Sequence, residues 1–254
     1  MQIQDMKKTM KLSRAILLAA SILILTSAAP TVPPPSKTLP VVNTKEILGR
    51  VDGVDIEAVV QSPSAQQTPL QIVCLFEFVE GDIFNSPPAL PKELNGIVHV
   101  DEALHGLITE LRKTNKFEGQ FLETLLIIPP AKTVPANKLL LIGLGNRNDF
   151  KPEMMRLVGL TGMREALRLE VANYSHASDL KDAGISSPTA DVAGFVIQGA
   201  IEAYQTQMYL KKQNASEALS VTKVSLLTGP AYFEDSKIGV KKAIAALSPS
   251  TPKE

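Results

Sequence analysis

The sequence predicts a three-layer α/β/α sandwich with a mixed, mostly parallel sheet. Two short aliphatic runs, Leu125–Ile128 and Leu139–Leu144, lack the polar–apolar alternation of a strand with one wet face. Strands of this kind are usually covered by helices on both faces. Amphipathic helical patterns lie before the two runs, at Asp101–Thr114, and after them, at Pro152–Leu169. Such alternation of strand and helix patterns is typical of layered α/β domains.

Composition narrows the class of protein. The chain has 254 residues, of which 44% are hydrophobic, and its formal net charge at pH 7 is zero. A neutral chain without a basic run does not have the charge pattern of a nucleic-acid-binding protein. The single cysteine, Cys74, lies in the apolar run QIVCLF and is expected to be a buried small hydrophobe. One cysteine also excludes an intramolecular disulfide.

The N-terminal segment has the pattern of a secretory signal peptide. Basic residues precede the apolar run Ala15–Leu25, and the small residues TSAA follow it. The run is too short for a comfortable membrane span, so residues 1–28 are predicted to be a removable export signal of a bacterial protein. Cleavage after Ala28 or Ala29 fits, and an uncleaved anchor is the alternative. The mature protein is expected in the periplasm or outside the cell, without membrane attachment.

The rest of the chain divides into three parts. Residues 29–41 are rich in proline and are predicted to form an extended linker. Residues 42–247 are predicted to form the folded domain. Residues 248–254 are polar, contain two of the chain's prolines, and are predicted to be a disordered tail.

The first half of the domain is predicted to hold two early strands and one helix. The strands, Val54–Val60 and Leu70–Phe78, are rich in β-branched and aromatic residues, and an antiparallel pairing between them is one option. Residues 81–96 read as loop with one helical turn near Pro91–Leu94. Asp101 is predicted to cap the N-terminus of a helix that ends near Asn115.

The second half alternates strictly between helices and strands. Pro152 suits the first turn of a helix that reaches Leu169. A second helix is predicted to start at Thr189 or Asp191, and its two glycines lower its propensity but permit close packing. The remaining predicted elements are strands at 170–176 and 221–227 and a final helix at 233–247.

The order of sequence landmarks resembles a known family. The strings ETLLIIP, LLLIGLGNRNDF, KPEMMRLVGLTGMREALRL and FVIQGAIEAYQTQMYLKK follow one another as in the N-terminal domain of the leucyl aminopeptidases, also called cytosol aminopeptidases. The most specific part, LLLIGLGNRNDFKPE, joins a strand, a Gly-x-Gly turn, a polar loop and a proline-started helix. The Gly-Ala-x-x-Ala-Tyr pattern at Gly199–Tyr204, interpreted as a helix end, is the second match. The resemblance runs from about Leu70 to Leu247 and implies a macro-domain-like fold.

The resemblance implies a fold without implying catalysis. In that family the metal ligands and an NTDAEGR-type signature lie in a separate C-terminal domain, and no NTDAEGR-like string occurs in this sequence. The interpretation therefore assigns no catalytic residue, no metal ligand and no cofactor, and the chain is expected not to be an aminopeptidase by itself.

The histidines and the loop carboxylates are the remaining candidates for metal ligands. His99, His105 and His176 do not have the spacing of a metal site. His105 is expected near the apolar side of its helix, where its polar atoms are satisfied. Asp179 and Asp182 are expected to be solvated carboxylates in a loop.

One turn is the candidate for ligand binding. It contains Gly143, Gly145, Asn146 and Arg147. Glycines after a strand let backbone N–H groups approach an anion, and an arginine there can neutralise it. The third glycine of a dinucleotide fingerprint is absent, because Asn148 occupies its place. A simple strand-ending turn is the alternative.

Three functions are considered, in this order. The favoured one is an interaction or regulatory module that pairs with itself, as a homo-oligomer, or with another exported protein. The second is a small-ligand binder for a nucleotide or an ADP-ribose-like molecule, beyond the carboxyl ends of the strands. The third is a component of a metallo-aminopeptidase. The incomplete glycine fingerprint places the interaction module first.

Overall fold

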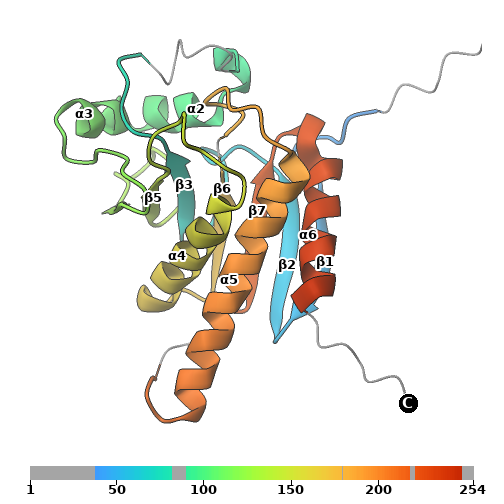
Figure 1. Ribbon diagram of the computed structural model, residues 1–254. Helices are drawn as coiled ribbons and strands as arrows, with labels where there is room; N and C mark the ends of the chain where they lie inside the picture. Colours follow the sequence, from blue (N-terminus) through green and yellow to red (C-terminus); the bar gives the residue numbers. More distant parts are fainter. Residues whose placement is uncertain (1–37, 82–89, 179, 218–220, 248–254) are drawn as a thin grey trace, which may run out of the picture. The chain divides into compact units, whose positions relative to one another are not determined.

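A single mixed sheet organises the computed structural model, which describes residues 38–81, 90–178, 180–217 and 221–247 (Figure 1). Within these residues the strand order is β1-β2-β7-β6-β3-β5-β4. The predicted signal peptide, the tail, and the linker up to residue 37 lie outside the described residues, so these three assignments stay predictions.

The five central strands are parallel and the two edge strands are antiparallel. Neighbours from β2 through β7, β6 and β3 to β5 run in one direction, whereas β1 and β4 run against theirs. This confirms the predicted mixed, mostly parallel sheet. The strands are β1 Lys45–Val51, β2 Val54–Val60, β3 Gln71–Leu75, β4 Thr124–Ile127, β5 Leu139–Gly143, β6 Asn173–Ala177 and β7 Lys223–Thr228.

Helices cover both faces of the sheet (Figure 1). On one face lie α4, Met154–Arg168, α5, Thr189–Lys212, and α6, Phe233–Leu247; on the other lie α2, Gly96–Ala103, and α3, Leu107–Lys113. Short 3-10 turns, η1 at Lys92–Leu94 and η2 at Pro230–Tyr232, precede α2 and α6. None of the described helices is both long enough and apolar enough to pass through a bilayer.

Strand β3 shows why the central strands are apolar throughout. Ile72 and Cys74 belong to the core that α4 and α5 cover, whereas Val73 and Leu75 belong to the core under α2 and α3. Successive side chains of a strand point to opposite faces, so a strand between two helical layers has no wet side. Cys74 is buried, as predicted.

Helix α5 packs against its neighbours at backbone distance. A Cβ atom on Gly199 would lie 1.7 Å from the carbonyl oxygen of Arg156 in α4, and one on Gly194 would lie 3.0 Å from that of Gly239 in α6. The close packing predicted from the glycines is confirmed. The interpretation of Gly199–Tyr204 as a helix end is wrong, because α5 continues to Lys212.

The antiparallel pairing considered for β2 and β3 is wrong. Strand β2 pairs with β1 on one side and with β7 on the other, and β3 lies between β6 and β5. The prediction missed β1, which forms a hairpin with β2 through Asp52 and Gly53, both at positive φ. An Asp-Gly pair between two strands is a strong hairpin signal. The antiparallel neighbour of β2 is therefore β1 and not β3.

The helix predicted from Asp101 onward is two helices. Helix α2 already begins at Gly96, where the Asn95 side chain accepts a hydrogen bond from the N–H of Val98. Asp101 lies inside α2 and its carboxylate accepts the N–H of Ile108 at 2.8 Å, so it caps α3 instead. His105 lies at the break between the helices, exposed and with a φ of 57°, so its predicted place near an apolar face is wrong.

Candidate functional site

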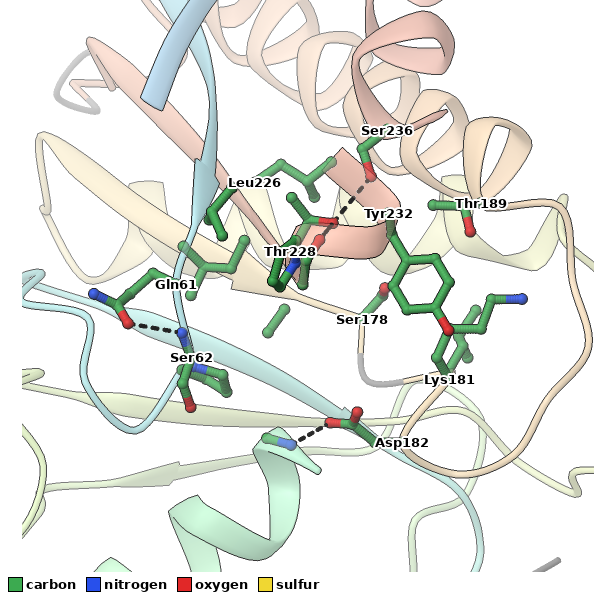
Figure 2. A pocket seen from close by; sticks show the side chains of 18 of the residues that line it. Gln61, Ser62, Ser178, Lys181, Asp182, Thr189, Leu226, Thr228, Tyr232 and Ser236 are labelled. Atoms are coloured by element: carbon green, nitrogen blue, oxygen red, sulfur yellow. Dashed lines mark hydrogen bonds between the residues drawn. The ribbon is translucent and has the colours of Figure 1, made fainter. Parts of the chain in front are cut away.

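A cavity of about 340 Å³ opens at the carboxyl ends of β2, β6 and β7 (Figure 2). These strands are parallel neighbours, so their ends meet at one edge of the sheet. Open α/β sheets bind ligands at this edge. The volume lies within the range of small-molecule sites, which is roughly 300–1,000 Å³.

The cavity has an apolar floor and a polar rim. Such a lining suits a ligand with an apolar body and a few polar groups. The floor includes Val60, Leu180, Val192, Ala193, Val196 and Leu226, and the rim includes Gln61, Ser62, Lys181, Ser187, Thr189 and Thr228.

The rim at the end of β2 is held by side-chain amides. The Gln61 Oε1 atom accepts the N–H of Ser62 at 2.9 Å, and Gln61 Nε2 donates to Asn43 Oδ1 at 2.7 Å. At the end of β7, Ser236 Oγ donates to Thr228 Oγ1 at 3.4 Å (Figure 2). These contacts hold two walls of the cavity in place. They do not involve the polar groups of the third wall, the loop between β6 and α5.

Lys181 closes the third wall, which is the loop between β6 and α5. Its Nζ donates to the carbonyl oxygen of Ser187 at 2.5 Å and lies 5.9 Å from the centre of the Tyr232 ring. Partial burial lowers the pKa of Lys181 below its usual value. Figure 2 shows Lys181 and Thr189 on the same side of the cavity. A cation therefore stands next to the start of α5.

Helix α5 starts at this wall without a side-chain cap. Its N-cap residue is Pro188, which makes no capping hydrogen bond. The backbone N–H groups of residues 189–191 have no partner among the described residues, because the first intrahelical bond is donated by Val192. The Ser187 side chain lines the cavity, is 8% exposed, and its Oγ has no hydrogen-bond partner among the described residues. The wall thus carries several unused polar groups.

Asp182 is not solvated, so this prediction is wrong. Its Oδ2 atom accepts the N–H of Gly96 at 2.8 Å and that of Ile97 at 3.2 Å, and the side chain is buried. A carboxylate at a helix N-terminus is stabilised by the free N–H groups there. Asp182 therefore fastens the loop to α2. Asp179 lies outside the described residues.

The predicted ligand turn lies elsewhere on the same sheet edge. Gly143, Gly145, Asn146 and Arg147 follow β5, and none of them lines the cavity. A Cβ on Gly143 would lie 1.9 Å from the carbonyl oxygen of Gln120, so chain packing alone requires a glycine there. Gly145 has a φ of 75°. Their role in ligand binding stays a prediction.

The polar groups of the turn are used within the chain. The Asn146 Oδ1 atom accepts the N–H of Asn148 at 2.9 Å, and Arg147 donates to the carbonyl oxygen of Ala183. Arg147 thereby joins the turn to the loop that carries Lys181. The structure brings the predicted turn and the cavity wall together through this contact.

The histidines occupy three different surroundings. His99 lines the cavity, His105 is exposed, and His176 is fully buried, with its Nε2 atom 3.7 Å from Cys74 Sγ. Burial lowers the pKa of His176 to about 4, so the ring is neutral at pH 7. Within the part of the chain that the structure describes, no three His, Cys, Asp or Glu side chains are grouped to hold a metal ion. These residues do not fit a metal centre.

Comparison with protein families identifies a related domain. The model of the "Cytosol aminopeptidase family, N-terminal domain" matches residues 84–213. A probable cytosol aminopeptidase of Thermosynechococcus vestitus is 32% identical over 136 residues, which are 51% of this chain and 25% of that protein. One from Alkaliphilus metalliredigens is 41% identical over 76 residues, which are 30% of this chain and 15% of that protein. The chain spans about a quarter or less of the length of these two relatives.

Solved structures share the fold. A leucine aminopeptidase from tomato aligns with a TM-score of 0.52 and 19% identity, covering 76% of this chain and 36% of that one. A Trypanosoma brucei macrodomain in complex with ADP-ribose aligns with a TM-score of 0.51 and 13% identity, covering 78% of this chain and 73% of that one. Because the identities are this low, the alignments show the fold alone. They confirm the predicted macro-like sandwich.

Proposed function

Because the chain belongs to the cytosol aminopeptidase family through that family's N-terminal domain, we propose that it is a binding domain whose cavity holds a small molecule. The family membership confirms the resemblance seen in the sequence. The observation that carries the proposal is the cavity at the ends of β2, β6 and β7, with its apolar floor and polar rim. Ligand binding therefore moves ahead of the interaction module that the sequence favoured.

A ligand screen tests this function. The probes are ADP-ribose, AMP, adenosine, leucine, octanoate and octanol, and the readout is the thermal unfolding midpoint of the purified protein. A probe at 100 times its Kd stabilises the folded state by about 2.7 kcal/mol, which raises the midpoint by roughly 5–10 °C for a domain of this size. ADP-ribose is included because the aligned Trypanosoma brucei macrodomain is in complex with it.

A blocking variant locates the binding site. Thr228 lies at the end of β7 on the cavity rim, and Thr222 is an exposed residue directly before the start of the same strand. The Thr228→Trp variant should fold and lose the ligand-dependent shift, because the indole fills the cavity. The matched Thr222→Trp variant should keep the shift. A response to no probe, or a response that survives in Thr228→Trp, contradicts the proposal.

We also propose that the described residues do not hydrolyse peptides. The absence of a three-ligand group from these residues supports this, since the family's chemistry requires bound metal. The purified protein should not release p-nitroaniline from leucyl-p-nitroanilide when zinc or manganese is added. Metal-dependent release that copurifies with the protein through several columns would sink this proposal.

Self-association is a second candidate, favoured by exposed apolar side chains in one short stretch. Leu39, Val41, Val42 and Ile47 lie within nine residues, and each is more than half exposed. Light scattering after size exclusion should detect a dimer if this stretch is an interface. Ile47→Lys should dissociate that dimer, whereas Ile238→Lys, at an equally exposed isoleucine of α6, should not. A monomer at all concentrations contradicts this candidate.

A further inference from the structure

Three kinds of polar group meet at one wall of the cavity. The first turn of α5 presents the N–H groups of residues 189–191, which have no partner among the described residues. The Ser187 hydroxyl, on a side chain more than nine-tenths buried, has none either. The Lys181 ammonium donates to backbone carbonyl oxygens, one of which belongs to Ser187. Ser187, Lys181 and Thr189 all line the cavity.

These groups share one electrostatic preference. The N-terminus of a helix carries roughly half a positive charge, and α5 has 24 residues, which is long enough for its full dipole. A lysine adds a full positive charge, and free N–H and O–H groups are hydrogen-bond donors. A buried polar group without a partner is destabilising, so such groups are normally satisfied by protein, water or a ligand. An anion satisfies all of them at once.

We infer that this wall binds an anionic group, a phosphate or a carboxylate, whose apolar or aromatic body lies on the cavity floor. This inference rests on the proposed small-molecule function and names the chemical class of the ligand. The anion accepts hydrogen bonds from the N–H groups of Thr189 and its neighbours, with the Ser187 hydroxyl as a further donor. The Lys181 ammonium compensates its charge.

Among the described residues, the acidic side chains near this wall leave it free for an anion. The Asp182 carboxylate lies in the same loop as Lys181, but it accepts two backbone N–H groups of α2, so its charge is compensated at the start of that helix. Asp191 lies in the first turn of α5, but it is exposed and is not part of the cavity lining. Glu93 lines the cavity from η1, also with an exposed side chain. The positive end of the cavity is therefore the start of α5.

Matched probes isolate the contribution of the anion. AMP is compared with adenosine, and octanoate with octanol, because the members of each pair share a body and differ in the charged group. Calorimetry should show that at least one charged probe binds about tenfold or more tightly than its neutral partner, which is the effect of one charge-assisted hydrogen bond. Preference for AMP identifies a phosphate and preference for octanoate a carboxylate. Inorganic phosphate should compete with the bound probe.

Nuclear magnetic resonance gives a second readout. Backbone amide signals of residues 189–191 should shift when the charged probe is added and should not shift with the neutral one. Equal affinities within both pairs, without these amide shifts, overturn the inference but leave the cavity as a neutral ligand site. Binding of none of the probes removes both the inference and the proposed function.

Two substitutions test the named side chains. In Ser187→Asp a carboxylate enters the wall and accepts the free N–H groups of α5, so anion binding should be lost while the thermal midpoint does not fall. The control Ser186→Asp places the same charge on the exposed neighbour and should reduce affinity less than threefold. Lys181→Met should weaken binding of the charged probe at least tenfold and change the affinity for the neutral probe little. Lys151→Met should change neither affinity. Wild-type affinity in Ser187→Asp overturns the inference.

Discussion

Two connections leave the sheet at the carboxyl ends of parallel strands, and their helices begin in different ways. Before α4, the N–H groups of Met154, Met155 and Arg156 each donate to a carbonyl oxygen three residues earlier, at 3.0–3.1 Å. Before α5, the chain enters the helix directly from Pro188, and the corresponding N–H groups have no partner among the described residues. The first connection satisfies itself, whereas the second leaves donors at the wall of a cavity.

The difference shows what a glycine-rich turn does and does not indicate. Gly143 is required because the chain at Gln120 passes within backbone contact of it. This packing accounts for Gly143, and a φ of 75° accounts for Gly145, so the Gly-x-Gly pattern is explained without a ligand. The loop before α5 has no such pattern, yet it carries the unused donors. Accounting for every backbone polar group therefore distinguishes the two connections, which the glycine motif alone does not.

The largest effect on stability expected from this comparison is that of a substitution at Gly143. A methyl group there would lie 1.9 Å from a carbonyl oxygen, and no rotamer change can relieve a clash with backbone. Gly143→Ala should therefore lower the free energy of unfolding by about 3 kcal/mol or more, at the upper end of overpacking effects. Urea denaturation followed by circular dichroism measures it.

A glycine at the cavity provides the control for this substitution. Gly229 has a φ of −72°, and a Cβ on it would be in ordinary contact with the Tyr232 ring at 3.6 Å. Gly229→Ala should change the free energy of unfolding by less than about 0.5 kcal/mol. Equal losses in the two variants would mean that the backbone contact at Gly143 does not set its requirement for glycine.

The second expected effect is on the pH dependence of stability. It concerns β3 and its partner β6, since β3 lies between the strands from which the two connections leave. His176 on β6 is buried beside Cys74 on β3, and burial lowers its pKa from 6.5 to about 4. Between these values the unfolded chain binds a proton that the folded chain excludes. The contribution of the neutral His176 ring to the free energy of unfolding is therefore fully present above pH 6.5 and is lost as the pH falls toward 4. The expected loss is about 2–3 kcal/mol between pH 7.5 and pH 4.5.

Variants separate this histidine from the carboxylates that also titrate. His176→Leu should flatten the decline in the free energy of unfolding between pH 6.5 and pH 4.5, and His105→Asn, at the exposed histidine, should leave it unchanged. If His176→Leu does not fold, the ring proton signals of the wild type still report the pKa. A His176 titration midpoint near 6.5 would disprove the expected acid sensitivity.

The sequence predicted most elements because local patterns determine them. The aliphatic runs of β4 and β5, the proline before α4 and the amphipathic stripe of α6 each act within about fifteen residues, and each element was found. The early strands were misplaced because pairing depends on distant segments. Strand β2 joins β7, more than 160 residues away in sequence, and no local pattern encodes that choice.

The candidate site depended on long-range contacts even more. Asp182 looked solvated because its partners, Gly96 and Ile97, are in a different helix. The Ser187 hydroxyl has no partner among the described residues, and this depends on which distant segments the fold brings near it. One local signal was present: Ser187-Pro188 precedes a long helix, and proline at its N-cap position supplies no side-chain acceptor.

The smallest effect is expected at Arg147, and it decides between the two connections as ligand sites. Its guanidinium donates to the carbonyl oxygen of Ala183, so Arg147→Ala should lower the free energy of unfolding by about 1 kcal/mol. Ligand affinity should change less than threefold, since Arg147 does not line the cavity. The control is Arg164→Ala, which removes an exposed arginine of α4 and should affect neither quantity. Loss of binding in Arg147→Ala while Ser187→Asp binds normally would place the site at the glycine turn, because only there does Arg147 meet a ligand directly.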